Sequence, residues 1–144
     1  MVMKFFIAWC LVAATVGIHA AGLGIVLDRF MRSPVHSESG FRQVTWLIIW
    51  VAWWLVLLHL TEILFWALFY WWQQCLPDAE SSFYFSGVTY ATIGYGDLVL
   101  PLEWRFFGPL EGLVGILMCG LSTGFFFALV SRLYFRGKAV TGKE

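Results

Sequence analysis

The chain has 144 residues, of which 60% are hydrophobic and 12% are charged, and its formal net charge at pH 7 is zero. This length bounds the protein to a single domain. The excess of apolar residues fits an integral membrane protein and fits a soluble domain poorly. The zero net charge by itself indicates no partner, and the sequence has no basic stretch of the kind that binds nucleic acid.

Residues 5–27 form the first apolar run. They carry no charge and are long enough for a helix that crosses a bilayer, which takes about 20 residues. Lys4 before this run and the small residues near its end also resemble a secretory signal peptide, so a cleaved leader is the alternative to a retained helix. Residues 28–42 are polar and are predicted to form a short loop.

Residues 44–72 form a second apolar run. It is longer than the hydrocarbon core requires, so the predicted helix tilts or projects beyond the membrane. Trp46 marks one end, and Trp71 and Trp72 mark the other, as aromatic belts do at the two interfaces. Cys75 follows directly, either as a free thiol or as half of an intersubunit disulfide.

A helix too short to cross a membrane follows the second run. Pro77 precedes acidic residues at 78–82, which is typical of a helix start, and residues 83–91 continue the helix. A short helix with irregular backbone at membrane depth is tolerated only where protein or a water-filled cavity surrounds it. We therefore predict a re-entrant helix and loop, followed by a last spanning helix over residues 106–135.

Residues 92–97, with the sequence TIGYGD, lie in this predicted loop. Gly94 and Gly96 allow positive φ angles, and alternating them with ordinary residues can aim successive carbonyl oxygens to one side. Several such segments around an axis would form rings of oxygen ligands that replace the water around a cation. Asp97 would then attract cations to the mouth. The alternative is an ordinary glycine turn that joins two helices.

This segment, together with residues 83–89, resembles the pore helix and selectivity filter of the potassium channel family, found in bacterial two-helix channels and two-pore-domain channels. The related sequence TVGYG forms the filter of that family. The resemblance implies that K⁺ is the permeant ion. It also implies that backbone carbonyls coordinate K⁺ at four positions: Thr92, Ile93, Gly94 and Tyr95.

The resemblance assigns further roles. The Thr92 hydroxyl would complete the innermost ion site, and Tyr84, Phe85 and Thr89 would support the filter, the two aromatic residues as a cuff. Gly115 falls where the family often has a gating-hinge glycine, although close helix packing explains a glycine there equally well.

The distribution of basic residues predicts the orientation. Lysine and arginine gather in residues 28–42 and after residue 131, so both stretches are expected to be cytoplasmic. The filter then opens outward, with Asp97 at the outer mouth and the N-terminus outside. A cleaved leader would place residues 28–42 outside and invert the filter, so we interpret residues 5–27 as a retained helix of a multi-pass protein of the cell membrane.

His59 and Glu62 are ionisable residues three positions apart on one face of the second predicted helix. Such residues inside a membrane are costly and are functional candidates by default. Glu62 could bond to the back of the pore helix, the pair could sense protons in gating, or the two could form a structural hydrogen bond between helices. An intramembrane metal enzyme would need further ligands, and the remaining histidines, His19 and His36, lie in different segments.

These observations predict an all-α integral membrane protein with an N-terminal helix and loop (1–43), a pore domain (44–136) and a short cytoplasmic tail (137–144). Because each chain has one pore loop, four copies are needed to surround an ion, so a homotetramer in membrane lipid is expected. We expect passive K⁺ conduction, no enzyme activity and no cofactor. The alternative is a non-conducting regulatory or assembly subunit of a potassium channel or transporter.

Overall fold

The computed structural model describes residues 2–32 and 41–141. Over these residues the chain is helical, without strands, and three of its helices are long and apolar enough to cross a membrane. Four helices form the described fold: α1 (Val2–Arg32), α2 (Phe41–Trp72), α3 (Ala79–Tyr90) and α4 (Phe107–Thr141).

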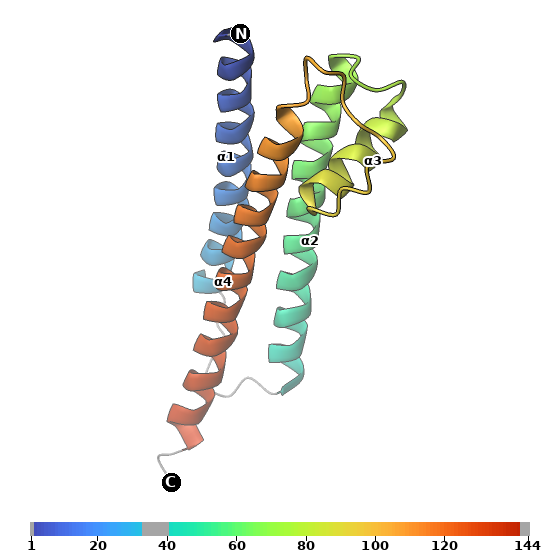
Figure 1. The fold of residues 1–144 in the computed structure, drawn as a ribbon. Coiled ribbons are helices and arrows are strands. Elements are labelled where there is room, and N and C mark those ends of the chain that lie inside the picture. The colour runs from blue at the N-terminus through green and yellow to red at the C-terminus, as the bar shows by residue number, and fades with distance from the viewer. Residues whose placement is uncertain (1, 33–40, 142–144) are drawn as a thin grey trace.

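The three long helices lie side by side, and the short helix α3 packs against one end of α2 and α4 (Figure 1). The start of α1, the end of α2 and the start of α4 all lie at the end of the bundle that carries α3. The predicted order of two long helices, one short helix and a further long helix is confirmed.

The long helices extend further than the apolar runs suggested. Helix α1 continues to Arg32, whose side chain pairs with Asp28 one turn earlier at 2.8 Å, so residues 28–32 are helical and not part of a loop. Basic groups in the last turn of α1 also favour its continuation, because they face the negative end of the helix dipole. Residues 33–40 lie outside the described residues.

Helix α3 begins where the acidic residues predicted it. Asp78 is its N-cap, with extended backbone, and the carboxylate accepts a hydrogen bond of 2.7 Å from the N–H of Ser81. This bond lowers the pKa of Asp78 below its ordinary value. Capping of this kind satisfies a backbone donor that the helix itself leaves unpaired, so it fixes the point at which α3 starts.

Aromatic side chains form the core at the end of the bundle that carries α3. Tyr70 of α2 and Phe85 of α3 meet edge to face with ring centroids 5.3 Å apart, and Phe107 of α4 and Ala8 of α1 belong to the same buried cluster. A second cluster at the opposite end includes the fully buried Val26 of α1. Since α1 contributes to both clusters, it packs against the other helices near both of its ends.

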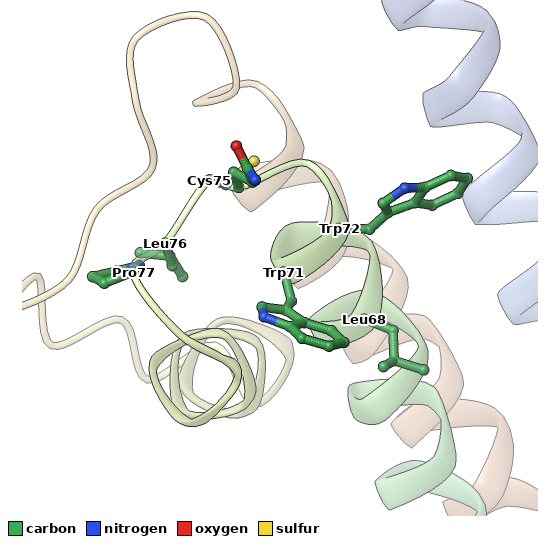
Figure 2. Close-up of a pocket in the computed structure, with 7 residues that line it drawn as sticks. Leu68, Trp71, Trp72, Cys75, Leu76 and Pro77 are labelled. Atoms are coloured by element: carbon green, nitrogen blue, oxygen red, sulfur yellow. The ribbon is translucent and has the colours of Figure 1, made fainter.

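The connection from α2 to α3 borders an open hollow of about 790 Å³. Figure 2 shows Trp71 and Trp72 projecting in different directions from the last turn of α2, with Leu76 and Pro77 in the connection. Cys75 is buried here, and its burial raises the pKa of the thiol to about 11. Within this chain Cys75 is a free, protonated thiol.

Candidate functional site

The backbone of residues 92–97 alternates between positive and ordinary φ angles. Gly94 has a φ of 53° and Gly96 a φ of 79°, as their lack of a side chain predicted. Thr92 also has a positive φ, of 59°, which the sequence did not indicate because this conformation is uncommon for residues other than glycine. Every second residue of the segment, Thr92, Gly94 and Gly96, therefore has a positive φ angle.

Hydrogen bonds attach the start of this segment to the end of α3. The N–H of Thr92 donates to the Thr89 carbonyl at 2.9 Å, and the N–H groups of Ile93 and Gly94 donate to the Val88 carbonyl at 2.8 and 3.1 Å. In the part of the chain that the structure describes, no hydrogen bond uses a carbonyl oxygen of residues 92–95. These oxygens remain free to bind a ligand.

The three residues that were predicted to support the 92–97 segment make three different kinds of contact. Phe85 is buried in the aromatic core against Tyr70, whereas Tyr84 is exposed and donates a hydrogen bond of 2.7 Å to the Asp97 carboxylate. This bond lowers the pKa of Asp97, which keeps the group ionised. Thr89 contributes its backbone carbonyl to the start of the 92–97 segment.

Residues 92–97 are exposed along their whole length in the single chain. Ile93 and Tyr95, the large side chains of the segment, are 54% and 70% exposed. A segment that is bonded to α3 at both ends and exposed between them offers both free carbonyls and large side chains to whatever lies beside it.

Glu111 is a functional candidate that we did not single out from the sequence. It is fully buried near the start of α4, where Tyr70 donates to one carboxylate oxygen at 2.7 Å and Ser86 lies 2.5 Å from the other. Ser86 also bonds to the Ile63 carbonyl at 2.8 Å. Glu111 thus joins α2, α3 and α4. An acidic residue inside an apolar run is the signal that could have identified it.

His59 and Glu62 lie together, as predicted, but their surroundings include residues that the sequence did not connect with them. The Tyr90 hydroxyl, at the end of α3, donates to the fully buried Glu62 carboxylate, a bond of the kind that one of the three alternatives described. His19 of α1 bonds to the other Glu62 oxygen at 2.8 Å, and His59 bonds to the Tyr90 hydroxyl at 2.9 Å. The expectation that His19 lies apart from this pair is wrong.

Gly115 lies where α4 passes closest to the end of α3. A Cβ atom at this position would collide with the Tyr90 carbonyl oxygen and would lie 3.0 Å from its carbonyl carbon. The helix continues without interruption through Gly115. The structure therefore supports the packing explanation for this glycine.

One comparison with known proteins finds a match. A family described as "Ion channel" matches residues 55–132, which include most of α2, all of α3, the 92–97 segment and most of α4. No curated protein and no solved structure matches the chain. The matched region is more than half of the chain and contains the free carbonyls of residues 92–95. The chain belongs to the ion channel family.

Proposed function

We propose that four copies of this chain form a potassium-selective pore, with residues 92–97 of each copy lining the ion pathway. The observation that carries the proposal is the alternation of positive φ at Thr92, Gly94 and Gly96 beside carbonyls that have no partner within the chain. Rings of backbone carbonyls are the ligands with which channels replace the hydration shell of K⁺. K⁺ is the permeant ion, and no enzymatic step is involved.

The helix α3 favours a cation at this place. Its C-terminal end carries partial negative charge and leads directly into Thr92. Asp97 adds a full negative charge at the far end of the segment, where Tyr84 holds it. A cation would therefore meet negative potential at both ends of the pathway.

The tetramer is supported by the surface that one chain leaves uncovered. One segment cannot surround an ion, so closed cyclic symmetry must supply the remaining ligands. Helix α4 also exposes large apolar side chains at helical spacing, which suits lipid contact and contact with other copies. These are Leu113, Ile116, Leu117, Leu121 and Phe127.

The proposed orientation places the 92–97 segment toward the cell exterior. Lys4 bonds to the Glu103 carbonyl at 2.9 Å, so the start of α1 lies beside the loop that follows this segment. The basic residues at 28–32 and Arg132 lie toward the opposite end and would face the cytoplasm. The N-terminus would then be outside, the C-terminus inside, and the protein would reside in the cell membrane.

The test is ion flux from liposomes that contain the purified protein and a K⁺ gradient. We expect flux with K⁺ and little flux when Na⁺ replaces it. Gly94→Ala should abolish the flux, because alanine resists the positive φ at position 94 by about 1–2 kcal/mol and would turn the neighbouring carbonyls. Gly120→Ala is the matched control, since a Cβ atom there meets nothing within the chain.

Each result decides a separate part of the proposal. Equal flux of Na⁺ and K⁺ would contradict selectivity while leaving the channel fold intact. Absence of flux from a verified tetramer across pH and lipid composition would favour a non-conducting regulatory subunit. A monomer or dimer by native mass measurement would contradict the fourfold pore.

A further inference from the structure

A buried polar cluster joins all four helices below the end of α3. We call it the histidine cluster, and it consists of His19 of α1, His59 and Glu62 of α2, Tyr90 of α3 and Ser122 of α4. Among the described residues, every buried side-chain nitrogen or oxygen has a hydrogen-bond partner. The cluster is therefore an ordered arrangement and not a polar defect in the bundle.

The buried carboxyl group of Glu62 must either be neutral or be paired with a positive charge. It has no exposed surface, and an isolated charge at membrane depth is costly. Residues 5–27, 44–72 and 106–131 contain no lysine or arginine. The carboxyl group is therefore neutralised by a proton of its own, by a protonated histidine or by a bound cation.

The cluster contains more nitrogen and oxygen ligand atoms than are needed to hold one proton. His19 and Glu62 alone can share a single proton, because Nδ1 of His19 lies 2.8 Å from Oε1 of Glu62. Instead His59 also lies 3.7 Å from the second carboxylate oxygen, and the two imidazole centroids are 5.4 Å apart. Two protonated imidazoles at this separation would repel each other, whereas two neutral imidazoles are metal ligands.

The donor set matches a transition cation. One donor atom from each of His19, His59 and Glu62 lies within 4.8 Å of the other two. Two histidines and one carboxylate are a set that binds Zn²⁺, whose tetrahedral ligands lie about 3.3 Å apart. The Tyr90 oxygen is 2.9 Å from Nδ1 of His59 and bonds to Glu62, so a fourth oxygen lies beside two of these three residues.

Two further features suit a metal site. The second ring nitrogen of His19 lies 3.3 Å from the Ser122 hydroxyl, and a hydrogen bond of this kind orients a ligating histidine. A cavity of about 320 Å³ between α2 and α4 is lined by His59, Cys119 and Ser122, among other residues. His59 is the one partly exposed ligand, so this cavity supplies a route for the ion.

We propose that His19, His59 and Glu62 bind one divalent transition cation per chain, with Zn²⁺ as the best-suited ion and the Tyr90 oxygen as the fourth ligand. The cation takes the place of the proton between His19 and Glu62. Tyr90 is the last residue of α3 and stands two positions before Thr92. The ion thus ties α1 to the base of the ion pathway.

Zinc binding by the purified full-length protein tests the proposal without any measurement of flux. The protein is stripped with a chelator in detergent, incubated with Zn²⁺ alone and desalted, and bound metal is counted by mass spectrometry. We expect about one Zn²⁺ per chain and a higher melting temperature with Zn²⁺. His59→Gln and Glu62→Gln should each weaken binding about tenfold or more, because each removes a ligand.

Glu111→Gln is the matched control, because Glu111 is also a buried glutamate bonded to a tyrosine but belongs to a different cluster. It should bind Zn²⁺ as the unchanged protein does. If Glu62→Gln does not fold, His59→Gln decides the question, since the His59 side chain is 20% exposed whereas that of Glu62 is fully buried.

Two results would overturn the metal site. One is that the unchanged, folded protein takes up no Zn²⁺. A melting temperature that changes with pH but not with Zn²⁺ would accompany this result. The other is equal uptake by the unchanged protein and by His59→Gln. Neither result bears on potassium flux, so failure of the metal site and failure of the proposed pore are distinguishable.

Discussion

At the scale of single residues, the closest approach of α4 to α3 depends on the missing side chain of Gly115. The Tyr90 carbonyl occupies the space where a Cβ atom would stand. A carbonyl of the backbone cannot rotate away as a side chain can. The close packing of α4 against the end of α3, just before the 92–97 segment, therefore requires a glycine at position 115.

We expect Gly115→Ala to lower the stability of the folded protein by about 1–3 kcal/mol, because the extra methyl group forces α3 and α4 apart. The measurement is thermal unfolding in detergent. Gly120→Ala is the control, since it adds the same methyl group to the same helix where the chain leaves open space. Equal melting temperatures for the two variants would show that α4 can shift at Gly115 without cost.

At the scale of helices, two buried glutamates hold α3 against its neighbours. Glu111 of α4 bonds to Tyr70 of α2 and Ser86 of α3. Glu62 of α2 bonds to Tyr90, the last residue of α3. The two carboxylates thus bond to α3 at an interior residue and at its C-terminal end, and these bonds add to the packing of α3 on α2 and α4.

We expect Tyr70→Phe to destabilise the protein by about 1–3 kcal/mol, because it leaves one oxygen of the buried Glu111 carboxylate without its donor. Chemical or thermal unfolding measures the difference. Thr61→Val is the control, since it removes an exposed hydroxyl of α2 that bonds only within that helix, to the Leu57 carbonyl. A Tyr70→Phe variant as stable as Thr61→Val would mean that another donor reaches Glu111.

At the scale of the whole molecule, the single chain is incomplete around the 92–97 segment. Its carbonyls have no partner within the chain, and Ile93 and Tyr95 are exposed. In the proposed tetramer, carbonyls of all four copies surround each K⁺ ion, so the ion would bind the tetramer and not the single chain. Assembly and ion binding would then stabilise each other.

We expect the tetramer to resist heat better in KCl than in NaCl. A ligand that binds only the assembled form stabilises it, by about 2.7 kcal/mol when its concentration is a hundred times Kd. The fraction of tetramer after heating, followed on a gel or by native mass measurement, gives the difference. Gly94→Ala should remove the advantage of KCl. Identical melting in the two salts would indicate that no K⁺ is shared among the copies.

The sequence alone determined the features that depend on neighbouring residues. Long apolar runs predicted the three long helices, Asp78 after Pro77 predicted the start of α3, and two glycines predicted the positive φ angles at 94 and 96. These follow from hydropathy, capping and backbone sterics, which act over a few residues. The family match to residues 55–132 agrees with that pattern.

The tertiary structure decided which distant residues meet. His19 and Glu62 are 43 positions apart, and Tyr90 is a further 28 from Glu62, so no local pattern connects them. The role of Glu111 also became clear only when α2, α3 and α4 packed around it. Side-chain contacts between helices depend on how each helix is rotated and tilted against the others. The sequence pattern of a single helix does not contain that information, because a helix that is apolar on every face can turn any of them inward.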